Sequence, residues 1–135
     1  MLEFWIEGRA IGKARPRFGR NGVVHTARGY GAWKSDAVLQ LIRLNLPEAP
    51  KPARIECYFV NFASSDVDNL VGAVLDALVQ GGVLGNDSSS YITAASGTFA
   101  RTKGKRGEEK PIGVLVRILP AQIEYIDLDL KAFAA

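Results

Sequence analysis

The sequence of 135 residues contains very little cysteine and histidine and no long apolar run. Its single cysteine, Cys57, excludes an internal disulfide and a zinc site built from several cysteines. Its single histidine, His25, is explained more simply as a structural residue or a phosphate neighbour than as a general base. No segment approaches the run of about 20 apolar residues that a membrane span requires, and the first residues do not resemble a signal peptide. We therefore expect a cytoplasmic protein without a membrane-embedded part.

Acidic residues are also missing from one long segment of the chain, so the basic residues of that segment form a cluster without neighbouring acids. Residues 9–34 contain no Asp or Glu, but they contain the bases Arg9, Lys13, Arg15, Arg17, Arg20, Arg28 and Lys34. A second basic cluster consists of Arg101, Lys103, Lys105, Arg106 and Lys110 and is diluted by Glu108 and Glu109. The formal net charge is only +3, so the clustering is more informative than the total. Clustered bases are typical of phosphate-binding surfaces, although two solvated loops would have the same composition.

Length and composition are those of one globular domain. A hydrophobic content of 47% with 23% charged residues is sufficient for a core, and no linker or internal repeat interrupts the chain. We expect a single domain over residues 1–135, with its core over about 3–119 and a C-terminal extension at 120–135.

Hydrophobic periodicity predicts the elements of this domain. Alternating apolar residues indicate strands at 3–8, 54–62, 91–101 and 111–119, with a shorter strand at 23–26. Apolar residues spaced by three or four indicate helices at 30–46 and 69–80. This order predicts a small two-layer α+β domain, in which two main helices pack on a mixed β-sheet. The order of the strands in that sheet does not follow from the pattern.

Three aspartates form the most informative pattern. Asp66 and Asp68 precede the second helix, and Asp87 follows nineteen residues after Asp68. With the predicted strand and helix in place, we expect these carboxylates to meet at one end of the sheet. Mg²⁺, or alternatively Mn²⁺, prefers such oxygen ligands and can activate water beside a phosphate.

The same three residues also have simpler explanations. Asp68 could cap the helix, Asp66 could be a solvated neighbour, and Asp87 could be an ordinary turn residue. A calcium-binding EF-hand is excluded, because Val71 occupies the position that requires Gly and Ala77 the position that requires Glu.

The motifs together resemble one known family. Asp66-Val67-Asp68-Asn69-Leu70, Leu75-Asp76-Ala77-Leu78, Gly82-Val83-Leu84 and Asn86-Asp87 are similar, in order and spacing, to the motifs of the RusA family of Holliday junction resolvases. Lys13-Ala14-Arg15-Pro16-Arg17 also resembles a basic segment common in that family. The resemblance spans most of residues 4–119.

The resemblance implies a cytoplasmic, bacterial or phage-encoded homodimer that binds branched DNA. Such an enzyme is Mg²⁺-dependent and resolves four-way junctions by paired symmetric nicks in DNA recombination and repair. The resemblance further implies that Asp66, Asp68 and Asp87 are both the catalytic residues and the metal ligands. The expected DNA-binding residues are Lys13, Arg15, Arg17, Arg20, Arg101, Lys103, Lys105 and Arg106.

Two positions depart from the family pattern. The family's usual catalytic lysine falls at Gly72, and the first residue of its Asp-Asp doublet is Asn86. A lysine at that position would stabilise charge on the phosphate in the transition state. Three alternatives therefore stay open: a slow enzyme, an enzyme that uses another base such as Lys103 or Arg101, or an inactive protein that binds branched DNA.

Overall fold

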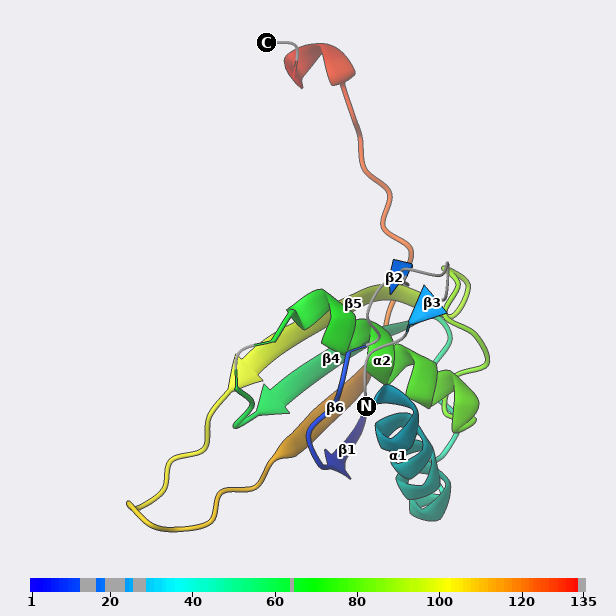
Figure 1. The fold of residues 1–135 in the computed structure, drawn as a ribbon. Coiled ribbons are helices and arrows are strands. Elements are labelled where there is room, and N and C mark those ends of the chain that lie inside the picture. Colours follow the sequence, from blue (N-terminus) through cyan, green and yellow to red (C-terminus); the bar gives the residue numbers. More distant parts are fainter. Residues whose placement is uncertain (13–16, 19–23, 26–28, 64, 134–135) are drawn as a thin grey trace.

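The computed structural model describes residues 1–12, 17–18, 24–25, 29–63 and 65–133. Its elements follow in the order β1 (Leu2–Glu7), β2 (Arg17–Phe18), β3 (Val24–His25), α1 (Tyr30–Leu44), β4 (Ala53–Val60), α2 (Val67–Gln80), β5 (Ile92–Ala100), β6 (Gly113–Pro120) and a 3₁₀ helix at Leu130–Phe133. The predicted α+β class, with two main helices on a mixed sheet, is confirmed (Figure 1). Within the described ranges, no helix is both long and apolar enough to cross a membrane.

Four strands form the main sheet in the order β1-β6-β4-β5. β6 pairs antiparallel with both β1 and β4, whereas β4 and β5 are parallel. Parallel neighbours need a crossover connection, and α2 is the helix of that crossover. β2 and β3 form a separate antiparallel pair, in which Arg17 lies opposite His25.

The helices and the sheet form two layers (Figure 1). α1 contacts β1 and α2, and α2 contacts β5, so both helices lie on one face of the sheet. In β4, Ile55, Cys57 and Phe59 are buried, while the residues between them are only partly buried, as alternation along a strand requires. The core also contains the buried side chains of Ile6, Leu41, Leu70, Val74, Leu78, Val114, Val116 and Ile118.

Gly97 determines how closely α2 approaches β5. A Cβ atom at this position would lie 2.6 Å from methyl carbons of both Val67 and Val71. Only glycine therefore leaves room for the first turns of α2 at this distance. As a result, the start of α2 packs tightly over the C-terminal half of β5.

The helix ends differ from the prediction at positions that matter for the site. α1 ends at Leu44 rather than at residue 46, because Asn45 adopts a left-handed conformation with a φ of 48°. α2 begins at Val67 rather than at residue 69, so Asp66 is its N-cap and Asp68 belongs to its first turn.

The C-terminal extension leaves the sheet after β6. Residues 122–133 are exposed and extend away from the rest of the molecule (Figure 1). Its exposed large side chains are Ile123, Tyr125, Ile126, Leu128, Leu130 and Phe133. The hydrophobic core accordingly ends at β6, close to the predicted limit of 119.

Candidate functional site

Two exposed carboxylates stand at the start of α2. Asp66 is the N-cap residue, but its side chain makes no capping hydrogen bond; its backbone carbonyl instead accepts the N–H of Leu70 at 3.2 Å. The Oδ1 atom of Asp68 accepts the backbone N–H of Asn69 at 2.9 Å. Negative charge is favourable at a helix N-terminus, so the presence of acidic residues there needs no functional explanation. An N-cap aspartate, however, usually accepts a backbone N–H of the first turn, and Asp66 does not. The oxygen atoms of Asp66 thus stay available to a cation.

Asp87 lies at the other end of the helix, contrary to the expectation that the three carboxylates meet. It belongs to the exposed turn after α2, where the N–H of Ser88 donates to Oδ1 of Asn86 at 3.0 Å. Because β5 is parallel to β4, α2 must carry the chain back to the opposite end of the sheet before β5 begins. A helix of 14 residues is about 21 Å long, so the turn that contains Asp87 lies at the far end of α2 from Asp66 and Asp68. Among the residues that the structure describes, no group of three or more His, Cys, Asp or Glu side chains is placed to hold a metal. A single subunit therefore brings Asp66 and Asp68 together without Asp87.

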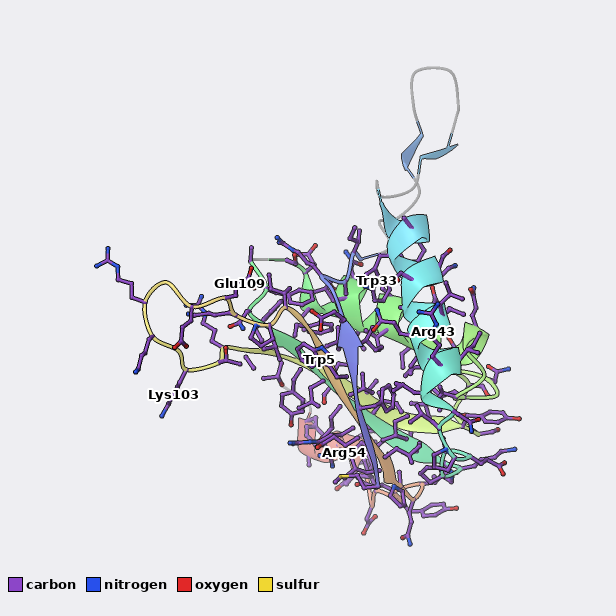
Figure 2. The ribbon with its side chains drawn as sticks, turned by 90° about the horizontal axis from the view of Figure 1, so that it is seen from below. Trp5, Trp33, Arg43, Arg54, Lys103 and Glu109 are labelled. Carbon is purple, nitrogen blue, oxygen red and sulfur yellow. The ribbon has the colours of Figure 1, made fainter. Side chains whose placement is uncertain are left out.

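The C-terminal ends of β4 and β5, together with Asp66 and Asp68, form what we call the carboxylate end of the sheet. The segment 101–110 leaves β5 at this end and returns to β6; all of its residues are exposed. We call it the cationic loop, because it carries Arg101, Lys103, Lys105, Arg106 and Lys110. Figure 2 shows the loop, with Lys103, projecting from the body of the protein. Four predicted DNA-binding residues, Arg101, Lys103, Lys105 and Arg106, thus lie on one exposed loop at the carboxylate end.

The first basic segment begins at the same end. Gly12 packs against the first turn of α2, where a Cβ on Gly12 would lie 2.7 Å from Cβ of Asn69. The backbone therefore lies beside Asn69, next in sequence to Asp68, at the point where it leads into residue 13. Of the predicted DNA-binding residues, Lys13, Arg15 and Arg20 lie outside the described residues, and Arg17 is placed only as part of the β2–β3 pair.

Gly72 and Asp76 follow Asp68 along one edge of α2, at successive turns of the helix. A Cβ on Gly72 would have no atom within 4 Å, so this position opens to solvent. Asp76 is only half-buried, and its Oδ2 accepts the hydroxyl of Tyr30 at 2.7 Å, which links α2 to α1. Burial and this hydrogen bond raise the pKa of Tyr30 well above its ordinary value. Asp76 therefore has a structural partner, whereas the side chain of Asp66 has none among the residues that the structure describes.

The sequence contains two further candidate side chains, one nucleophilic and one basic, Cys57 and His25. Cys57 is buried in β4, and burial raises the pKa of its thiol to about 12. The thiolate is therefore scarce at neutral pH, in agreement with the expected inert strand cysteine. His25 is described only through the backbone pairing of β3.

Sequence reasoning missed one residue that organises the carboxylate end. Asn61 follows β4 directly and has a φ of 60°. Its amide contacts both arms of the cationic loop: Nδ2 donates to Oγ1 of Thr102 at 3.0 Å and to the carbonyl of Pro111 at 2.6 Å. Oδ1 accepts the N–H of Thr102 at 3.1 Å. The only signal in the sequence was an asparagine after a strand, a residue that tolerates positive φ.

A comparison with models of protein families finds no match, and a comparison with curated proteins finds none either. The function is therefore inferred from this chain's own residues and from the motifs that they form.

Proposed function

We propose that this protein is a metal-dependent endonuclease that resolves four-way DNA junctions by paired symmetric nicks. One observation carries the proposal: the exposed carboxylates of Asp66 and Asp68 lie at the same end of the sheet as the cationic loop. Carboxylate oxygens bind a hard cation, and clustered Lys and Arg side chains bind the phosphates beside it. A cation and a phosphodiester can therefore meet at this end.

The chemistry of the donors fits Mg²⁺, with Mn²⁺ as an alternative. Asp66 and Asp68 offer carboxylate oxygens that are exposed, and the side chain of Asp66 is not used to cap the helix. When bound, such a cation supplies the Lewis acidity that activates water for attack on the scissile phosphate. The bases of the cationic loop, and Lys13, Arg15 and Arg17 in the first basic segment, would hold the DNA backbone in register.

A third carboxylate has to come from elsewhere, and we propose that it is Asp87 of a second copy. β5 is an edge strand, with no other described segment on its outer side, and its nine residues include no charge and no proline. Edge strands without such protection are prone to pair with another chain. Antiparallel pairing of two β5 edges about a two-fold axis would bring the partner's Asp87 turn beside Asp66 and Asp68. Such a homodimer has two equivalent sites, which suits two symmetric nicks.

Gly72 supports a second candidate function, a protein that binds branched DNA but cleaves it slowly or not at all. The position where the resembled family has its lysine is open and lacks any side chain. A cationic group there would stabilise charge that develops on the phosphate. Both candidate functions predict junction binding, and only the first predicts efficient cleavage.

A synthetic four-way junction separates the two functions. With Mg²⁺ or Mn²⁺, the wild-type protein should introduce symmetric nicks, and Asp68→Asn should slow them by about a hundredfold or more. Asp127→Asn is the matched control, since it removes an exposed carboxylate from the C-terminal extension and should cleave at the wild-type rate. Binding measured without divalent metal should be similar for all three proteins. Junction binding without nicking by the wild type would favour the second function, and nicking that survives Asp68→Asn would exclude the proposed site.

A further inference from the structure

Asn61 stands between the two functional parts of the carboxylate end. The connection that it begins, residues 61–66, leads from β4 to the carboxylate of Asp66. Its side chain contacts Thr102, near the start of the cationic loop, and Pro111, directly after its end. One residue is therefore linked to the carboxylates through the backbone and to the cations through its amide.

The contacts use every hydrogen-bonding part of this asparagine side chain. The amide group donates to Thr102 and to Pro111, and the amide oxygen accepts from the backbone of Thr102. Its backbone N–H donates to the carbonyl of Ala100 at 2.9 Å. An aspartate could accept from Thr102, but it could not donate to the Pro111 carbonyl and would face it with negative charge. The set of bonds therefore requires an amide rather than a carboxylate.

The conformation of Asn61 is what makes these contacts possible. Its φ of 60° is in the left-handed region, which residues other than Gly, Asn and Asp rarely adopt. Non-glycine residues in this region persist where the surrounding structure holds them and often mark functional positions. Here the left-handed turn ends β4 and places the amide between the two arms of the loop.

We infer that Asn61 is a positioning residue, which holds the cationic loop in one orientation relative to Asp66 and Asp68 so that its bases bind DNA phosphates next to the cut. This inference rests on the proposed function. The loop contains no helix or strand. Among the described residues, the hydrogen bonds within the loop are those between Lys105 and Glu108. Without the Asn61 bridge, the Lys105–Glu108 bonds near the tip would be the only hydrogen bonds between the two arms among the described residues. Phosphate binding would then have to order the loop, and affinity would fall.

Two variants of Asn61 test this role. Asn61→Asp keeps the size and the favoured φ but removes both donated bonds, whereas Asn61→Gly keeps the backbone conformation and removes the whole side chain. Both variants should weaken junction binding on the order of tenfold. The slope of the logarithm of the binding constant against the logarithm of the salt concentration should also become shallower, by about 1 for each phosphate that the protein no longer binds. Hydrogen exchange at the Thr102 amide should accelerate in Asn61→Gly, because that amide loses its acceptor. Asn45→Gly and Asn45→Asp are the matched controls: Asn45 is also a left-handed asparagine, and it ends α1.

A double-mutant cycle distinguishes positioning from a general structural role. In a background with Lys103→Gln, Lys105→Gln and Arg106→Gln, the loop has lost most of its cations, and Asn61→Asp should reduce affinity no further. An equal loss in both backgrounds would overturn the inference, as would wild-type affinity and salt dependence in both Asn61 variants. If the wild-type protein itself fails to bind the junction, the proposed function fails instead. Faster exchange at Thr102 in Asn61→Gly would then still support the loop-ordering part of the inference.

Discussion

The two ends of α2 carry the same kind of side chain in different surroundings. At its start, Asp66 and Asp68 are exposed at the same end of the sheet as the cationic loop, and Gly12, which precedes the first basic segment in sequence, packs against Asn69. Past its other end, Asp87 lies in an exposed turn. This turn precedes β5 and the cationic loop follows it, so the full length of β5 lies between the two. Among the described residues, the first end is the one that combines carboxylates with a dense set of cations.

The three aspartates are of the right type for a metal site, but residue type alone does not bring them together. Two carboxylates beside cations can attract a metal and a phosphate, but a third ligand beyond the far end of α2, a helix about 21 Å long, cannot join them within one subunit. A two-fold axis that pairs opposite ends would bring the two regions together, and each subunit would then contribute to both sites.

The largest effect is expected when two inactive variants are mixed. Asp68→Asn and Asp87→Asn should each slow cleavage by about a hundredfold or more, but their heterodimer retains one site in which all three aspartates are intact. After subunit exchange, cleavage should return to roughly a quarter of the wild-type rate, as single nicks, because half of the dimers are mixed and each has one intact site. Mixing Asp66→Asn with Asp68→Asn is the control and should restore nothing. No recovery in the first mixture would show that the ends do not cooperate between subunits.

A cation added at the carboxylate end should raise the rate. Gly72→Lys places an ammonium group one helical turn from Asp68, where no neighbouring atom obstructs a side chain. We expect cleavage to accelerate on the order of tenfold to a hundredfold, because the ammonium stabilises charge on the phosphate. Gly72→Ala controls for the gain in helix stability, which is about 0.5–1 kcal/mol. Equal cleavage rates for Gly72→Lys and Gly72→Ala would show that the absence of a lysine at this position does not limit the rate of cleavage.

Loss of the Tyr30 hydroxyl should affect stability and not cleavage. Tyr30→Phe removes the hydrogen bond to Asp76 and should lower the free energy of unfolding by about 1–2 kcal/mol, measured in urea. The pKa of Tyr30 is raised in the folded state, so above pH 10 the unfolded chain loses this proton first. The stabilisation is therefore complete below pH 10 and declines as the pH rises further. The difference between wild type and variant should shrink in that range, and a constant difference would contradict the assignment.

The smallest effect is expected at Cys57, which lies in β4 between the two ends. Its buried thiol has a pKa of about 12, so iodoacetamide at pH 8 should modify the folded protein far more slowly than the protein unfolded in urea. Cys57→Ala should keep the junction-cleavage rate of the wild type. Rapid modification of the folded protein, with loss of cleavage, would mean that this strand is more accessible than its burial indicates.

Local sequence patterns were sufficient for the two main helices, for the four strands of the main sheet and for one half of the candidate site. Alternation in β4 and in β6, and the spacing of Leu70, Val74 and Leu78 in α2, follow from which side chains face the core. The same patterns placed Asp66 and Asp68 at the start of a helix and the cationic loop between two strands. These features depend on residues that are close in sequence, so the sequence alone determines them.

Only the tertiary structure decided how those parts are arranged. The parallel pairing of β4 with β5 places Asp87 at the far end of α2, and no periodicity in the sequence distinguishes that pairing from an antiparallel one. The bridge from Asn61 to Thr102 and Pro111 joins residues that are 41 and 50 positions apart. Strand order and such long-range hydrogen bonds depend on which surfaces meet when the chain collapses, and local side-chain patterns do not encode them.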